Sequence, residues 1–207
     1  MADILIDNQS APTTPSSGKS VIWIDSTTKK LVNTDDSGKH RNGFLSTNDA
    51  TGQQTGFATD TYLTGSNITI PSFGMQTTQL YQWVVGIEKT AAGTGAIVMT
   101  VRTGTNGAIG DTSRAALTQT VAQTATASVT VVNVYVYVRT VSASGVLVAY
   151  LDIGGNSGTT TGWGDGDRVV SSTFDNSAMG GQFIGLSLNG GTSASYTIDL
   201  VKGWLNA

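Results

Sequence analysis

The sequence predicts an all-β protein, a jelly-roll-type β-sandwich preceded by a small N-terminal β meander or arm. Three features of the chain indicate this fold class. The run VTVVNVYVYVR at 129–139 is apolar on both sides of a strand. Gly, Ser and Thr are abundant and strong helix formers are few, which favours strands joined by frequent turns. Short apolar runs recur at the spacing typical of sandwich strands, and no helical periodicity persists along the chain.

The run at 129–139 shows how such a strand is built. Side chains alternate between the two sides of a strand. The side opposite Asn133 holds four valines: Val132, Val134, Val136 and Val138. The side with Asn133 also carries Val131, Tyr135 and Tyr137. One face is therefore expected to pack in a sandwich core, and the other to be covered by a second layer, a loop or another subunit.

The first 50 residues differ from the rest in charge, with five of the 11 basic and six of the 14 acidic residues. Their pattern predicts a series of short elements: a strand at 4–6, a breaker-rich segment at 10–18, a strand at 21–25, a turn at 26–29, a return strand at 30–33 and a turn at 36–38. So few apolar side chains make such a meander marginal alone. We therefore expect Trp23 and Ile24 to need a neighbour and to attach the chain to another protein.

Residues 45–61 have no periodicity and are expected to form a linker or an extended arm. The domain division follows from this: 1–55 is the attachment arm and meander, and 56–207 is the sandwich. The later apolar runs predict strands at 68–70, 80–88, 96–104, 129–139, 146–153, 168–174, 183–190 and 195–205.

Two expectations concern segments within the sandwich. Residues 112–122 show at most a short helix or turn. In the last run, Tyr196, Ile198 and Leu200 alternate with polar residues, so all three are expected on one face.

Composition excludes several classes of partner. The net charge is −3 and neither sign clusters, so we expect neither nucleic acid nor anionic membrane as a partner. The longest apolar runs are far shorter than a membrane span. The N-terminal residues MADILIDNQS carry acids where a signal peptide carries positive charge, so we expect synthesis in a cytoplasm without Sec export. The sequence contains no cysteine, which excludes thiolate chemistry.

Catalytic groups are scarce. His40 is the single histidine and lies between Lys39 and Arg41 in the polar meander. We expect it to be a solvated turn residue rather than a member of a catalytic triad. One His and 0 Cys speak against a zinc site. Glu88 is the lone Glu, at a strand end beside Lys89, and is expected to be an exposed charge rather than half of a glycosidase pair. We expect no catalytic residue, no metal site and no cofactor.

The segment GGNSGTTTGWGDGDR at 154–168 is the best candidate for a binding loop. Asp165 and Asp167 alternate with Gly, as oxygen ligands of Ca²⁺ sometimes do, and Trp163 could stack on a sugar ring. The EF-hand spacing is absent, and Gly-Asp-Gly-Asp is ordinary turn chemistry. A plain surface loop and a glycan or cation loop therefore both stay open.

Two parts of the chain carry a family likeness. The stretch APTTPSSGKSVIWIDSTTKKLVNTDDSGKHR is similar to an N-terminal module of bacteriophage tail fibres and other virion proteins. The segments TYLTGSNITIP, EKTAAGTGAI, VRTGTNGAIGDTSRA, FDNSAMGGQFIGLSLN and SASYTIDLV resemble the jelly-roll domain of phage head-decoration, fibre and spike proteins. The resemblance implies a homotrimer displayed on a virion and supplies no catalytic residues. We expect the trimer interface at Tyr135 and Tyr137.

These observations favour a non-enzymatic phage virion structural protein. The first hypothesis is a trimeric capsid decoration, cement or head-fibre protein on the capsid surface, whose N-terminal part binds the major capsid protein or another virion protein. The alternative is a tail-fibre or spike receptor-binding protein that recognises a host surface glycan. A carbohydrate-binding module detached from an enzyme is a third. The head is favoured over the tail because the chain is short and lacks a repetitive shaft.

Overall fold

The computed structural model describes residues 8–10, 13–17, 19, 21–26, 31–34, 40–41, 47–50, 53–77, 79–119, 124–153, 166–191 and 195–206. The chain divides into two compact units, residues 1–47 and 48–207. The division expected from the sequence lies a few residues later, after residue 55. No helix in the described part is long and apolar enough to cross a membrane.

The N-terminal unit is a small sheet in the order β1-β2-β3-β4. Its strands are β1 (Asn8–Gln9), β2 (Val21–Asp25), β3 (Leu31–Thr34) and β4 (His40–Arg41). The strands β2, β3 and β4 form an antiparallel meander, and β1 joins β2 in parallel. The strand expected at 4–6 lies outside the described residues.

The meander buries its tryptophan, contrary to expectation. Trp23 exposes 2% of its surface, and its Nε1 donates a hydrogen bond to Thr34 Oγ1 at 2.7 Å. Ile24 is half-buried, whereas Ile22 exposes 59%. Because alternate residues of β2 face opposite sides, Ile22 and Ile24 lie on the face opposite Trp23. The expectation that Trp23 lacks burial is therefore wrong, and Ile22 is the large apolar side chain left exposed on β2.

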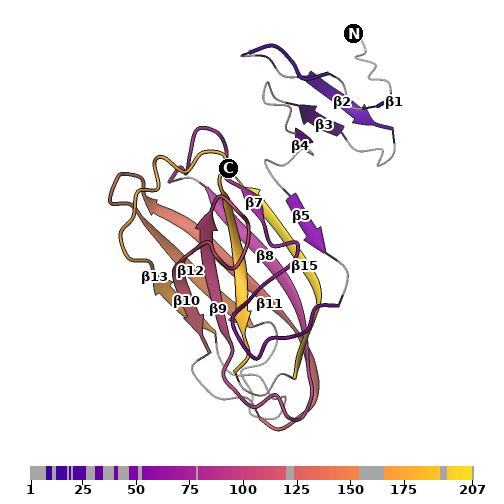
Figure 1. The fold of residues 1–207 in the computed structure, drawn as a ribbon, viewed down its shortest axis with the longest axis vertical. Helices are drawn as coiled ribbons and strands as arrows, with labels where there is room; N and C mark the ends of the chain where they lie inside the picture. Colours follow the sequence, from indigo (N-terminus) through magenta and orange to yellow (C-terminus); the bar gives the residue numbers. More distant parts are fainter. Residues whose placement is uncertain are drawn as a thin grey trace, which may run out of the picture. The chain divides into compact units, whose positions relative to one another are not determined.

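The second unit is a β-sandwich of two antiparallel sheets, which confirms the predicted fold class (Figure 1). One sheet has the order β13-β12-β11-β8-β15-β5 and is called the six-stranded sheet below. Its strands are β5 (Thr47–Ala50), β8 (Leu80–Lys89), β11 (Ser128–Thr140), β12 (Val146–Ile153), β13 (Asp167–Val170) and β15 (Tyr196–Asn206).

The other sheet has the order β10-β9-β14-β6, with β7 also paired to β14, and is called the five-stranded sheet. Its strands are β6 (Thr61–Tyr62), β7 (Ile68–Thr69), β9 (Val98–Gly104), β10 (Thr112–Thr118) and β14 (Phe183–Asn189). The chain passes from one sheet to the other between β5 and β6, β7 and β8, β8 and β9, β10 and β11, β13 and β14, and β14 and β15. Sheets that exchange strands in this way share one core.

The core lies between the inner faces of the two sheets. Fully buried side chains from both sheets fill it: Trp83, Val85, Ile87, Met99, Val101, Ile184, Leu186 and Leu188. The four valines predicted for the inner face of β11 expose at most 1% each. That part of the strand prediction is confirmed.

Two segments differ from the sequence expectation. Residues 112–122 were expected to form at most a short helix, but β10 is a strand paired with β9, with Ala115 and Leu117 buried. Residues 45–61 were expected to form a linker, but they contain β5, a fully buried Phe57 and a backbone pair between Gln54 and Ile198. In both cases strand pairing supplies the structure that local periodicity does not show: β10 pairs with the preceding strand β9, and Gln54 pairs with the distant β15.

A β-bulge in β15 shows that the alternation predicted for Tyr196, Ile198 and Leu200 is wrong at Leu200. The pairing with β8 shifts between Ile198 and Leu200, so Asp199 is an extra residue. An extra residue reverses the facing of all residues that follow it. Val201 is therefore buried, and Leu200 lies half-buried on the outer face opposite Gly86.

Candidate functional site

The face of the six-stranded sheet that points away from the core is apolar and partly uncovered. This outer face carries the odd-numbered residues of β11. Val129 exposes 69% and Val131 44% of their surface. Tyr135 and Tyr137, further along the same strand, are half-buried. The second apolar face inferred from the sequence is therefore present, and part of it is left to solvent.

Register across the sheet aligns five of these outer residues in one line. Tyr150 of β12 pairs with Tyr135 of β11, which pairs with Gln82 of β8, which pairs with Trp204 of β15. Arg168 of β13 pairs with Tyr150 and extends the line by one strand. We call Arg168, Tyr150, Tyr135, Gln82 and Trp204 the aromatic row. It runs perpendicular to the strands and crosses most of the sheet.

Neighbouring contacts hold the side chains of the aromatic row in place. The rings of Tyr150 and Tyr137 stack with centroids 6.3 Å apart and an interplanar angle of 26°. The guanidinium carbon of Arg168 lies 5.3 Å from the centroid of the Tyr150 ring, within cation–π range. Gln82 Oε1 accepts hydrogen bonds from Trp204 Nε1 at 2.8 Å and from Asn206 Nδ2 at 2.5 Å. Tyr137 and Arg168 thus hold the Tyr150 ring, and Gln82 fixes the edge of the Trp204 ring.

The sequence pointed to part of this site. It placed Tyr135 and Tyr137 on an outer face, and the structure brings them together with Tyr150 and Trp204, which sequence reasoning missed. Tyr150 and Trp204 lie in predicted strands, so the two-residue alternation of side chains around them could be recognised in the sequence. Their alignment with Tyr135 depends on strand order and on the bulge at Asp199, and neither can be read from local periodicity.

Asp167 of the predicted binding loop has a structural role. Its Oδ2 accepts a hydrogen bond from the backbone N of Thr118 at 2.8 Å, and its Oδ1 accepts one from the N of Arg168 at 2.6 Å. Thr118 ends β10 and Asp167 begins β13, so the carboxylate joins an edge strand of each sheet. Trp163 and Asp165 lie outside the described residues.

The remaining sequence candidates are not assembled into a reactive site among the described residues. Glu88 is exposed on β8, as expected. His40 lies in β4, and its side chain lies outside the description. No group of three or more His, Asp or Glu side chains in the described part could hold a metal ion.

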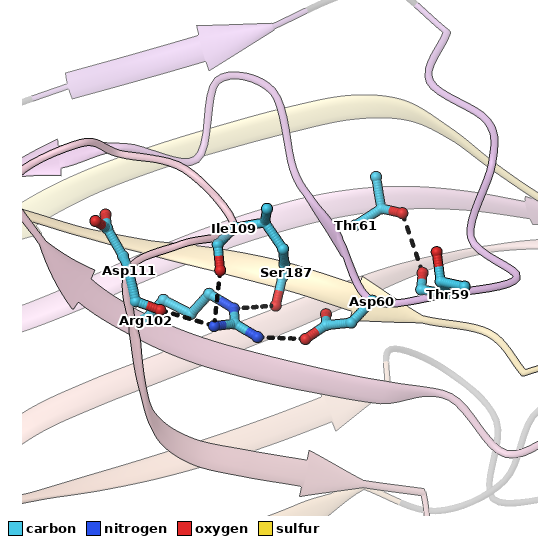
Figure 2. A network of polar contacts seen from close by, with 7 residues as sticks. All are labelled: Thr59, Asp60, Thr61, Arg102, Ile109, Asp111 and Ser187. Carbon is cyan, nitrogen blue, oxygen red and sulfur yellow. Dashed lines mark hydrogen bonds and ion pairs between the residues drawn. The ribbon is translucent and has the colours of Figure 1, made fainter.

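A second polar cluster lies on the outer face of the five-stranded sheet (Figure 2). Arg102 Nε donates to Ser187 Oγ at 2.8 Å. Its Nη1 donates to the backbone oxygens of Asp111 at 2.7 Å and Ile109 at 3.1 Å, and its Nη2 contacts Asp60 Oδ2. Four acceptors thus surround one guanidinium.

This arginine cluster fixes two loops on the sheet. The carboxylate of Asp111 accepts hydrogen bonds from the N of Asn106 and the N of Ala108, which shapes the loop between β9 and β10. Burial raises the pKa of nearby Tyr62 to about 12, so its hydroxyl stays protonated and donates to Asn67 Oδ1 at 2.6 Å. Because four protein acceptors already bind this guanidinium, we interpret this cluster as structural.

No model of a known protein family matches the chain, and no curated protein matches it. Among solved structures, a xylan β-1,4-xylosidase from Bacillus halodurans C-125 is similar at 11% identity with a TM-score of 0.30. The similarity covers 84% of this chain and 46% of that chain, so the protein spans less than half of the xylosidase's length.

Proposed function

We propose that this protein is a non-enzymatic virion structural protein, a homotrimeric capsid decoration protein that binds the shell through its N-terminal unit. The observation that carries the self-association is the uncovered apolar part of the outer face. Val129 and Val131 are the exposed apolar residues of β11, and Leu200 lies in line with Val131 on the far side of Gly86. We call these three residues the valine end.

The valine end is a better centre for the interface than the tyrosines indicated by the sequence. Tyr135 and Tyr137 are already half-buried by neighbours on their own sheet. Burying one exposed valine fully contributes roughly 1.5–3 kcal/mol. Two such valines in each of three subunits therefore stabilise the trimer by burial of apolar surface. The tyrosines contribute less, because less of their surface is exposed.

Replacing Val129 and Val131 together by Ser should dissociate the trimer, because each change removes apolar surface that only association would bury. Val170→Ser is the matched control, since Val170 exposes 45% on the edge strand β13. Sedimentation equilibrium at micromolar concentration measures the result. A wild-type protein that sediments as a monomer would exclude this proposal.

Attachment to the shell is proposed for the exposed side of β2. Ile22 exposes 59%, and Ile24 shares its face. Ile22→Ser in the full chain should leave the trimer intact and reduce the number of copies that rebind to stripped particles. Equal rebinding by variant and wild type would place the attachment elsewhere.

A second candidate is a receptor-binding fibre or spike protein that recognises a host surface glycan. The aromatic row favours it, because partly exposed rings with amide and guanidinium neighbours suit sugars as well as protein. Copies per virion separate the two candidates: a decoration protein occurs many times on the head, and a receptor-binding protein a few times on the tail.

A further inference from the structure

Asparagine is followed by glycine at three places in the chain, 42–43, 106–107 and 189–190. Because glycine has no side chain to shield its backbone N, this N can attack the side-chain carbonyl of the preceding asparagine and displace the amide. We propose that Asn106 is a site where this spontaneous covalent modification takes place in the folded protein. The modification site is independent of the proposed function, since it needs neither a shell nor a trimer.

The reaction needs only the chain and water. The N of Gly107 forms a bond to Cγ of Asn106 and gives up its proton, while the bond from Cγ to the side-chain N breaks and ammonia leaves with that proton. The product is a five-membered cyclic imide. Water then opens this ring at one of its two carbonyl carbons. Opening at Cγ leaves aspartate, and opening at the main-chain carbonyl leaves isoaspartate, in which the backbone runs through the side chain.

The two reacting groups at Asn106 are not held by other parts of the protein. Asn106 is exposed in the loop between β9 and β10. Asp111 accepts hydrogen bonds from the N of Asn106 and the N of Ala108, the two positions that flank Gly107. Within the described ranges, no hydrogen bond uses the N of Gly107 or the side chain of Asn106. The attacking N and the amide that it displaces are therefore both available.

The same loop requires glycine at the attacking position. Gly107 has a φ of 59°, a backbone conformation that residues with a side chain rarely adopt. A Cβ atom at Gly107 would also collide with the side-chain amide of Asn67, whose Nδ2 donates to the O of Gly107 at 3.3 Å. The fold thus keeps at this position the one residue that leaves the neighbouring asparagine open to attack.

The pair Asn189 and Gly190 has the same local sequence but is protected by the fold. The N of Gly190 donates a hydrogen bond to the backbone O of Phe57 at 2.8 Å, and Gly190 is buried. The Oδ1 atom of Asn189 accepts a hydrogen bond from the N of Gly191 at 2.8 Å. Attack at Asn189 therefore requires local opening of these contacts first. The chain provides its own matched comparison for Asn106.

Reaction at Asn106 would disturb the arginine cluster (Figure 2). Both products place a new carboxylate beside the carboxylate of Asp111, and like charges repel. Isoaspartate also adds a carbon atom to the main chain before Gly107, which separates the two N–H groups that Asp111 holds. The backbone O of Asp111 binds Arg102, so we expect the modified loop to be held less firmly on the five-stranded sheet.

Peptide mapping of the full-length protein tests the site. Trypsin cuts after Lys and Arg, so the three asparagines fall on different peptides, 42–89, 103–114 and 169–202. After incubation in a mildly alkaline buffer, mass spectrometry measures the fraction of each peptide in which an amide has become an acid, and fragment ions assign it to a residue. We expect Asn106 to react at least about tenfold faster than Asn189, because only Asn189 needs prior opening. Labelling with isoaspartate methyltransferase should identify the isoaspartate product on 103–114.

The same incubation in urea is the control for local sequence. In the unfolded chain both asparagines are free, so their rates should agree within about twofold. A difference that persists in urea would overturn the proposal, since the neighbouring residues alone would then explain it. An unaltered Asn106 in the folded protein, or equal rates at Asn106 and Asn189 there, would also overturn it.

Asn106→Gln tests the effect on the loop, because its longer side chain would have to form a larger and slower ring. Incubated wild type should unfold at a lower urea concentration than fresh wild type, whereas incubation should leave the midpoint of Asn106→Gln unchanged. An unchanged midpoint in wild type whose Asn106 has reacted would overturn the predicted loosening of the loop. An equal fall in both proteins would assign the loss of stability to another residue.

Discussion

Lys89 is a charged side chain held inside the sandwich. It exposes 1% of its surface, and its Nζ donates to the backbone oxygen of Thr124 at 2.7 Å and to that of Thr126. The sequence placed Lys89 beside Glu88 at a strand end and gave no sign of burial. Register explains it: Lys89 pairs with Ser128 and Tyr196, so strands flank it on both sides.

The buried amine predicts a pH dependence of stability. Desolvation lowers the pKa of Lys89 below 10.5 in the folded protein. Unfolding returns the amine to water, so between the two pKa values the unfolded chain binds more protons than the folded chain. The free energy of unfolding contributed by Lys89 therefore rises as pH increases through this window, which ends near 10.5.

Lys89→Met tests this dependence, because Met has similar length and does not titrate. Urea unfolding of both proteins from pH 7 to pH 10 should show the wild type gaining stability relative to the variant. Taking the difference cancels the tyrosines, including Tyr196, whose pKa burial raises to about 12. A difference that stays constant across the range would contradict the prediction.

At the scale of elements, Asp167 shows how one side chain closes an open edge of the sandwich. It connects β10 with β13 through the N of Thr118. On the same side, the guanidinium of Arg114 lies 4.0 Å from the centroid of the Phe174 ring. The Asp167 contact thus joins two edge strands that belong to different sheets, and the Arg114 contact joins β10 to the segment that follows β13.

Asp167→Asn should lower the free energy of unfolding by about 1–2 kcal/mol, because one charge-assisted acceptor becomes an amide donor facing a backbone N–H. Asp152→Asn, an exposed carboxylate on neighbouring β12, is the control and should change stability little. Chemical denaturation measures both. Equal stability of the two variants would show that the Asp167 contact contributes nothing.

The elements show what the sequence could and could not predict. Strands with strict alternation, such as β11, were predicted with their inner faces because period two is a local property. The short strand β5 was missed because its partner β15 lies far away in the sequence. The strand β10 pairs with the preceding β9, and it was missed because Arg114, Ala115 and Leu117 are good helix formers and because the pairing shifts between Ser113 and Ala115. The aromatic row needed both register and the bulge at Asp199, and of its five members only Tyr135 was singled out from the sequence.

At the scale of the molecule, the segment before β6 belongs to the sandwich more than the sequence suggested. Phe57 is fully buried, and Gln54 exchanges two backbone hydrogen bonds with Ile198. A chain starting at residue 47 should therefore be more stable than one starting at residue 58. The expected difference is about 3–5 kcal/mol, the usual cost of removing a buried Phe.

Urea titration of the two truncated proteins checks this prediction, with Phe57→Ala in the longer one as an intermediate case. Equal midpoints for both truncations would show that residues 47–57 do not contribute to the sandwich.

The arginine cluster on the five-stranded sheet has a consequence for assembly. Arg102 holds the loops around Asp60 and Ile109 against the outside of that sheet. A sheet face already covered by its own chain offers no flat surface to a neighbouring copy. We therefore expect the proposed trimer to form through the six-stranded sheet, and a contact between two different patches of neighbouring subunits closes into a ring only where its rotation closes.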